Sequence, residues 1–255
     1  NWTANTSWNT DVLGAGGTQA GAGLWPGSAA GDIAIIGDNG AGAVITISYP
    51  TNTANSIASI TIQDDAILNF GNNSKTLATT GDFTMDGTAS ITGGNANRVL
   101  NVGGQFKVLS TATTIDVGAI GLTVTGAANI DGVVTFSSNT GVKTFSSLVT
   151  VSSPNGSWTS TSITTAARLI FQNGIVSNGV LFSASDGTFN ANSQSISGSR
   201  ALTFSSTVDI PANITITSTT SVSITGTLDA SSGAPTWIND NGSTLIYGNS
   251  TKMFN

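Results

Sequence analysis

Residues 77–87 read LATTGDFTMDG, residues 100–108 read LNVGGQFKV, and residues 122–132 read LTVTGAANIDG. The leucines that open these three stretches lie 23 and 22 residues apart. Each stretch alternates apolar and polar side chains, which is the period of a β-strand. A repeat near 22 residues corresponds to one coil of a β-helix, in which two or three short strands are joined by bends. The sequence therefore predicts an all-β fold, a parallel β-helix (β-solenoid) with coils of about 22 residues.

Similar alternations recur along the rest of the chain: Val44, Ile45 and Ile47; Ile60 and Ile62; Leu202 and Phe204; Val222 and Ile224. We interpret the stretches that begin at Leu202 and Val222 as weaker echoes of the repeat that Leu77 opens. Residues 44–255 are predicted to form one continuous solenoid domain. Residues 1–43 are predicted to be an N-terminal capping segment, whose tryptophans Trp2, Trp8 and Trp25 cover the first coil; exposed tryptophans would instead indicate carbohydrate stacking.

Asn-Gly or Asp-Gly pairs lie between the alternating runs, and they begin at residues 39, 86, 131, 155, 173, 178, 186 and 241. Such pairs accept positive φ angles with little strain and mark tight turns. Turns of this kind also join hairpins, so a β-sandwich is the alternative fold. The repeat of about 22 residues favours the solenoid.

The composition is dominated by small neutral side chains, with 96 Ser, Thr and Asn residues, 31 Gly, and only 8% charged residues. Equivalent positions in stacked coils lie roughly 4.8 Å apart, so a repeated charge would repel itself. Ser, Thr and Asn can instead form hydrogen-bonded ladders. Low charge therefore fits a stack of coils.

The net charge of −6 disfavours nucleic acid as a partner, because phosphate binding needs clustered Lys and Arg. The sequence also lacks a basic surface helix and any apolar run of about 18 residues, so we expect no membrane insertion. The chain begins at Asn1 without a signal-peptide pattern. The expectation is that a leader was removed or that the chain is part of a longer product.

The residue types that most catalysts use are missing, since the sequence has no Cys, no His and no Glu. The usual nucleophilic triads are therefore impossible, and Ser74–Lys75 has no supporting motif for a dyad. The adjacent carboxylates of Asp64–Asp65 would point to opposite faces of an extended strand. Asp86 and Asp131 occupy equivalent turn positions about two coils apart, where turn chemistry explains them. We predict no catalytic residues and no enzyme activity.

No cofactor is expected, and calcium is the one ion for which the sequence offers oxygen ligands in turns. The candidate ligands are Asp32, Asp38 and Asn39 in one segment, and Asn239, Asp240 and Asn241 in another. Neither segment has the spacing of a known calcium loop. We interpret both as local Asx turns, so no metal-binding residue is predicted.

Acceptor sequences for N-linked glycans occur at Asn1, Asn5, Asn72, Asn155, Asn213, Asn241 and Asn249. In a chain so rich in Asn, Ser and Thr, several of these arise by chance. Where the source attaches N-glycans, the solvated loops are the expected acceptors.

The first segment combines Trp2, Trp8 and Asn9 with Trp25-Pro26-Gly27 and Gly31-Asp32, and then with Ile33, Ile35, Ile36 and residues 57–62 (IASITI). This order resembles the N-terminal region of large secreted bacterial β-helix proteins, the adhesin-like passengers of autotransporter or Bacteroidetes-type secretion routes. The later stretches LTVTG (122–126), FQNGIVSNG (171–179), GTFNA (187–191) and ISGS (196–199) are similar to their repeats. The resemblance implies an extracellular β-helix without a shared catalytic motif.

These observations favour an extracellular or cell-surface structural protein, such as a filament subunit or an adhesin stalk. The last apolar alternation, residues 243–254, still has the pattern of a strand, so we expect end-to-end contacts between copies or continuation into further repeats. Surface glycans are a second expected partner. The alternatives are a carbohydrate-binding or carbohydrate-cleaving β-helix, and a β-sandwich subunit that polymerises by donating residues 1–10 as a strand.

Overall fold

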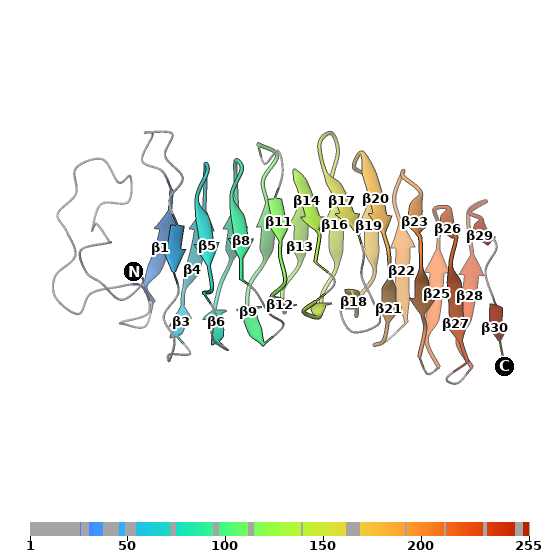
Figure 1. Cartoon of the computed structure of the whole chain (residues 1–255). Coiled ribbons are helices and arrows are strands. Elements are labelled where there is room, and N and C mark those ends of the chain that lie inside the picture. Colours follow the sequence, from blue (N-terminus) through green and yellow to red (C-terminus); the bar gives the residue numbers. More distant parts are fainter. Residues whose placement is uncertain are drawn as a thin grey trace.

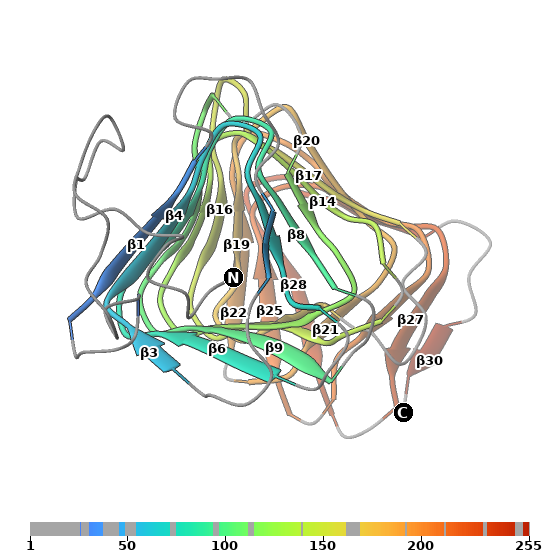
Figure 2. The same ribbon diagram turned by 60° about the vertical axis from the view of Figure 1, so that its left-hand side comes forward.

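The computed structural model is a three-sided parallel β-solenoid in which successive coils lie side by side along one axis (Figure 1). Viewed closer to that axis, the three sheets enclose a triangular core (Figure 2). The structure describes residues 26, 31–37, 46–48, 55–71, 75–93, 97–111, 115–138, 140–161, 169–191, 193–211, 213–231, 234–247 and 252–254. The described strands form three sheets of ten strands each, and every pairing is parallel.

Each sheet takes every third strand of the chain. The first sheet contains β1 (Ile33–Ile36), β4 (Ser59–Ile62), β7 (Phe83–Met85), β10 (Phe106–Val108), β13 (Ala128–Ile130), β16 (Val149–Val151), β19 (Ile175–Ser177), β22 (Gln194–Ser197), β25 (Thr215–Ser218) and β28 (Thr236–Asn239). The second sheet contains β2 (Thr46–Ser48), β5 (Ile67–Asn69), β8 (Ser90–Thr92), β11 (Ile115–Val117), β14 (Val133–Phe136), β17 (Ser157–Ser160), β20 (Leu181–Ala184), β23 (Leu202–Phe204), β26 (Val222–Ile224) and β29 (Leu245–Tyr247). The third sheet contains β3 (Asn55–Ile57), β6 (Lys75–Thr79), β9 (Arg98–Val102), β12 (Gly121–Val124), β15 (Lys143–Phe145), β18 (Leu169–Phe171), β21 (Gly187–Phe189), β24 (Thr207–Asp209), β27 (Thr227–Ala230) and β30 (Lys252–Phe254).

The strand register confirms the repeat that the sequence predicts. Leu77, Leu100 and Leu122 are direct neighbours on β6, β9 and β12 of the third sheet, and all three are fully buried. Phe83 pairs with Phe106 in the first sheet in the same way. The separation between paired residues varies from 18 (Ile170 with Thr188) to 26 (Lys143 with Leu169), because the loops at the corners differ in length. The parallel β-solenoid is thus confirmed.

One part of the sequence alignment is wrong in register. Leu202 and Val222 do pair with each other, but they lie in the second sheet, whereas Leu77 and its equivalents lie in the third. The apolar alternation is the same on all three sides of the solenoid, so the pattern alone does not distinguish one sheet from another.

The alternative of a β-sandwich is excluded, since its sheets would be antiparallel and packed in two layers. It follows that the donor-strand mechanism, which required a sandwich, loses its structural basis. The strand β1 lies inside the stretch 1–43 that the sequence assigns to the cap, and it already pairs with β4 in the first sheet. Trp2, Trp8 and Trp25 lie outside the described residues.

The core is a continuous column of buried aliphatic and aromatic side chains that runs through the stack. In its middle, Trp158 contacts the rings of Phe136, Phe145, Phe171 and Phe182 at centroid distances of 4.5–6.0 Å. Aromatic pairs in such arrangements add attraction beyond the area that they bury. These side chains come from the second and third sheets and therefore tie two sides of the solenoid together.

The bends between strands bring backbones of successive coils into direct contact. At one corner, Gly81, Gly104 and Gly126 stack above one another, and the N–H of each donates to a carbonyl of the coil before it. A Cβ atom on Gly126 would lie 2.3 Å from the Gly104 oxygen, so this corner requires glycine. The described Asn-Gly and Asp-Gly pairs lie in such bends between parallel strands rather than in hairpins.

Candidate functional site

The outer surface of the second sheet carries a column of hydroxyl side chains. Thr135, Thr159, Ser183, Thr203 and Ser223 are successive register neighbours on β14, β17, β20, β23 and β26. Each is partly exposed, and the residues flanking each of them on its strand are buried or half-exposed apolar and hydroxyl side chains, apart from the exposed Leu181 beside Phe182. Neighbouring hydroxyls occur elsewhere too, as in the 2.9 Å contact between Ser221 Oγ and Thr244 Oγ1. The predicted neutral ladders are therefore present.

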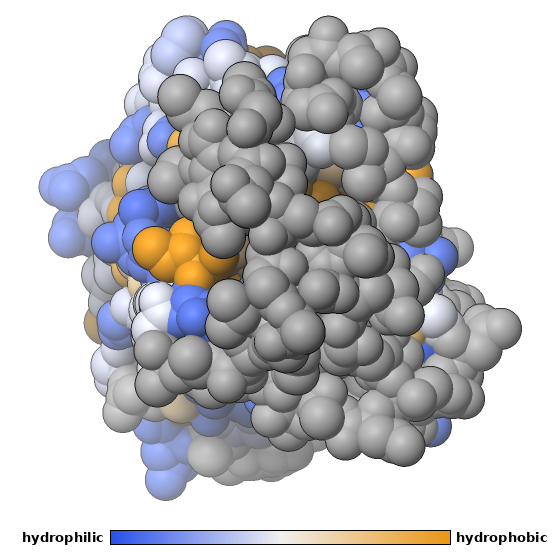
Figure 3. All heavy atoms as spheres, turned by 90° about the vertical axis from the view of Figure 1, so that its left-hand side faces the viewer, coloured by the Kyte–Doolittle hydropathy of each residue, from blue (hydrophilic) through white to orange (hydrophobic). Residues whose placement is uncertain are grey.

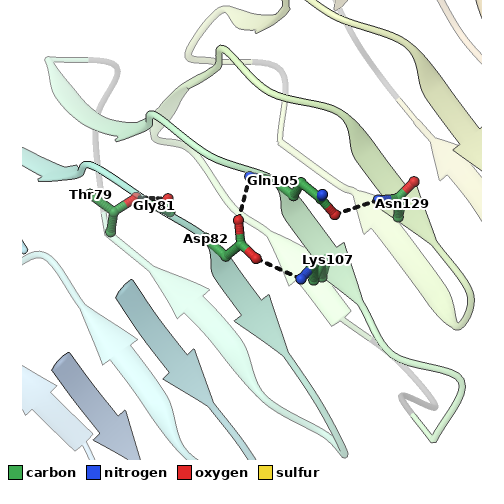
Figure 4. Close-up of polar contacts among 6 residues, drawn as sticks. All are labelled: Thr79, Gly81, Asp82, Gln105, Lys107 and Asn129. Carbon is green, nitrogen blue, oxygen red and sulfur yellow. Dashed lines mark hydrogen bonds and ion pairs between the residues drawn. The ribbon is translucent and has the colours of Figure 1, made fainter. Parts of the chain in front are cut away.

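A short polar network crosses three coils on the outside of the first sheet (Figure 4). The Lys107 ammonium donates to Asp82 Oδ2 at 2.5 Å, the Gln105 N–H donates to Asp82 Oδ1 at 2.9 Å, and Asn129 Nδ2 donates to Gln105 Oε1 at 2.9 Å. The hydrogen bond from Lys107, followed by that from Gln105, lowers the pKa of Asp82. Both charged side chains are about one-third exposed, so solvent screening keeps the contribution of this pair small.

Lys143 is fully buried and points into the core. It occupies the position of Leu122 and Leu169, its register neighbours on β12 and β18. Its ammonium donates three hydrogen bonds, to the carbonyl oxygens of Gly118 (3.1 Å), Thr140 (2.8 Å) and Gly141 (2.8 Å). Burial lowers the pKa of Lys143 to about 8, and the Asp116 carboxylate acts in the opposite direction.

The acids that the sequence singled out are used by their own turns. Asp86 Oδ1 accepts from the Gly87 N–H at 2.7 Å and from the Thr111 hydroxyl. Asp131 follows Ile130, which stands two steps along the ladder from Met85, so Asp86 and Asp131 are equivalent and two coils apart, as predicted.

The expectation for Asp64–Asp65 was wrong in one respect. These residues form a turn between β4 and β5 rather than part of an extended strand, and Asp64 has a positive φ of 56°. The Thr88 hydroxyl of the next coil donates to Asp65 Oδ1. Ser74 lies outside the described residues, and Lys75 belongs to β6.

The calcium candidates are local turns where the structure describes them. Asp240 Oδ1 accepts from the Asn241 N–H at 2.8 Å, and Asn239 Oδ1 accepts from Trp237 Nε1 at 3.1 Å. Asp32 precedes β1, while Asp38 and Asn39 lie outside the described residues. Within the described ranges, no three acidic side chains come close enough together to hold a metal ion.

Two features of the surface and core were missed by sequence reasoning. Asp209 and Asp229 are direct register neighbours on β24 and β27, which only the correct alignment of the third sheet reveals. The inward position of Lys143 had one available signal: Phe145, two residues later, aligns with Val124 and Val102 of earlier coils. That alignment places Lys143 inward and Val142, which is 42% exposed, outward.

Three of the glycan acceptor sequences lie in the described part of the chain, and their asparagines, Asn155, Asn213 and Asn241, are exposed. The other four, Asn1, Asn5, Asn72 and Asn249, lie outside it. The described segments include no helix with the length and apolar character needed to cross a membrane.

The chain matches no family model, no curated protein and no solved structure. The fold therefore defines its class, a three-sided parallel β-solenoid, and its function has to be argued from the side chains described above.

Proposed function

We propose that this chain is an extracellular or cell-surface structural protein, a filament subunit or adhesin stalk built from stacked coils. The observation that carries the proposal is the hydroxyl column from Thr135 to Ser223 over an unbroken apolar core. A long, stiff body whose surface presents neutral hydroxyls has the properties of a spacer, because it is ordered along its whole length and offers little charge to unrelated partners.

The proposal is tested by antibody labelling of intact and permeabilised source cells. Label on intact cells supports it. Label that appears only after permeabilisation contradicts it, whatever the state of assembly.

The proposed partner is a further set of parallel strands, supplied by another copy of the chain or by additional coils. Within the described residues, β28, β29 and β30 each pair on one side only. Ile238 on β28 is 44% exposed, and Ile33 on β1, at the opposite end of the same sheet, is 63% exposed. A hydrophobic patch is visible at that opposite end (Figure 3). Stacking of copies would bring these isoleucines together on one face and satisfy the open backbone groups.

Sedimentation velocity over a range of concentrations tests this contact. We expect the wild-type chain to form larger species as concentration rises, and Ile238→Asp to remain monomeric. Val180→Asp, at a position that is 56% exposed in the middle of the stack, is the matched control and should behave as wild type. A wild-type chain that stays monomeric throughout rejects end-to-end contacts between copies while leaving the surface location to the labelling experiment.

A further inference from the structure

Four Asn-Gly pairs lie in the described residues, beginning at Asn155, Asn173, Asn178 and Asn241; a fifth, at Asn39, lies outside them. An asparagine followed by glycine can react with its own backbone. The glycine nitrogen loses its proton and attacks the side-chain amide carbon, a five-membered succinimide forms, and ammonia leaves. Water then opens the ring to aspartate or to isoaspartate. The reaction needs a glycine nitrogen that is not held in a hydrogen bond and a backbone that is free to rotate.

In two of the four pairs the glycine nitrogen is already engaged. The Gly156 N–H donates to the Ser152 oxygen at 2.8 Å, and the Gly174 N–H donates to Gln194 Oε1 at 3.0 Å. Both glycines are buried. Attack by either nitrogen would require breaking a buried hydrogen bond and opening the coil around it.

The third pair is held through the asparagine side chain. Asn178 Oδ1 accepts from the Ser199 N–H at 2.9 Å, which fixes the amide that would be attacked. The backbone of Gly179 packs against the coil before it so closely that an added Cβ would lie 2.1 Å from the Gly156 oxygen. This packing prevents the rotation that ring closure needs.

The fourth pair has none of these restraints. Asn241 and Gly242 are both exposed, and the Gly242 N–H has no hydrogen-bond partner. An added Cβ on Gly242 would meet no atom within 4 Å. The turn is held at its flanks, by the Ser243 N–H donating to the Asp240 oxygen at 3.0 Å and by the Asn241 N–H donating to Asp240 Oδ1 at 2.8 Å. The peptide bond between Asn241 and Gly242 lies between these anchors and is unrestrained.

We propose that Asn241 is a self-modification site, at which the native chain deamidates through attack by the Gly242 nitrogen while the other described Asn-Gly pairs are protected. The overall reaction consumes one water molecule and releases one ammonia molecule. It places a carboxylate beside Asp240 and destroys the glycan acceptor sequence that Asn241 begins. This inference is independent of the proposed scaffold function.

The test uses the purified chain from a host that attaches no N-glycans, incubated at mildly alkaline pH and sampled over time by peptide mass spectrometry. In the folded chain, Asn241 should convert at least about tenfold faster than Asn155, Asn173 or Asn178, a ratio that corresponds to a modest local opening free energy at the protected sites. In strong urea, all four should convert at similar rates.

Two variants sharpen the test. Asn241→Gln should stop the charge change that isoelectric focusing detects in the folded chain, and Asn241→Asp should migrate from the start like the product. Equal rates for all four pairs in the folded chain would overturn the proposal. So would an Asn241 that stays intact in the folded chain while it reacts in urea.

Discussion

Lys143 shows how a charged residue can occupy a core position in this fold. The neighbours above and below it are leucines, and the ammonium avoids the apolar interior by turning towards three carbonyl oxygens. These oxygens come from two successive coils, so the side chain joins the corner at Gly118 to the corner at Thr140 and Gly141. Burial still disfavours the charged form, and this opposition makes stability depend on pH.

The sign of that dependence follows from the two pKa values. Unfolded Lys143 keeps its proton up to the ordinary pKa of 10.5, whereas folded Lys143 loses it above about 8. Between these values the unfolded state binds more protons, so the free energy of unfolding rises with pH. We expect the wild-type chain to gain up to about 3 kcal/mol across this window relative to Lys143→Met. Urea unfolding at pH 7, 8, 9 and 10 measures the difference, and parallel pH profiles for the two proteins would contradict the assignment.

Gly126 gives a second prediction at the scale of one residue. Gly126→Ala places a Cβ 2.3 Å from a backbone oxygen of the neighbouring coil, and neither backbone can move without disturbing the ladder. We expect a loss of about 1–3 kcal/mol in the free energy of unfolding. Gly121→Ala is the control five residues earlier, where the nearest atoms would lie at 3.4 Å and the change should be close to neutral. Chemical denaturation of both variants checks the contrast, and equal losses would contradict it.

At the scale of the strand, the aromatic cluster around Trp158 concentrates the stabilising contacts between the second and third sheets. The ring is fully buried and touches four other aromatic rings on β14, β15, β18 and β20. Its indole N–H has no hydrogen-bond partner, so packing rather than hydrogen bonding holds it.

Trp158→Ala should therefore cost roughly 3–5 kcal/mol, through lost contacts and the cavity that remains. Val180→Ala, at an exposed position just before β20, should change stability by no more than about 0.5 kcal/mol. Thermal and urea unfolding measure both. A loss for Trp158→Ala below about 1 kcal/mol would mean that this part of the stack is not packed as described.

The sequence predicted the strands and their stacking well where one residue type repeats at one position, as in the column Leu77, Leu100 and Leu122. It failed where a position changes character. Lys143 interrupts that column, and its hydropathy alone would place it in solvent. Asp64–Asp65 was predicted to be in an extended strand because a local alternation does not reveal where a coil bends. Leu202 was aligned to the wrong sheet because all three sheets share the same period.

The candidate site was less predictable than the fold. The hydroxyl column emerges only when loops of unequal length are removed from the alignment, since its five members are separated by 24, 24, 20 and 20 residues, from Thr135 through Thr159, Ser183 and Thr203 to Ser223. Likewise, whether an Asn-Gly pair is protected depends on a hydrogen bond from another coil, such as that from Gly174 to Gln194. Neither relation is local in sequence.

At the scale of the whole molecule, everything proposed here depends on in-register parallel stacking. The chain has no cysteine, so two introduced cysteines can be labelled specifically. Thr135→Cys and Ser223→Cys, each carrying a nitroxide, report the register across five strands of the second sheet. Both positions face outward, so the labels should leave the core undisturbed.

The most direct measurement is the distance between these two labels by pulsed electron–electron double resonance. Four steps along a parallel ladder place the two backbones roughly 19 Å apart, although 88 residues separate them in sequence. A single narrow distribution centred near 20 Å is the predicted result. A broad distribution, or one centred beyond about 30 Å, would contradict the stacked solenoid and the functional proposal that rests on it.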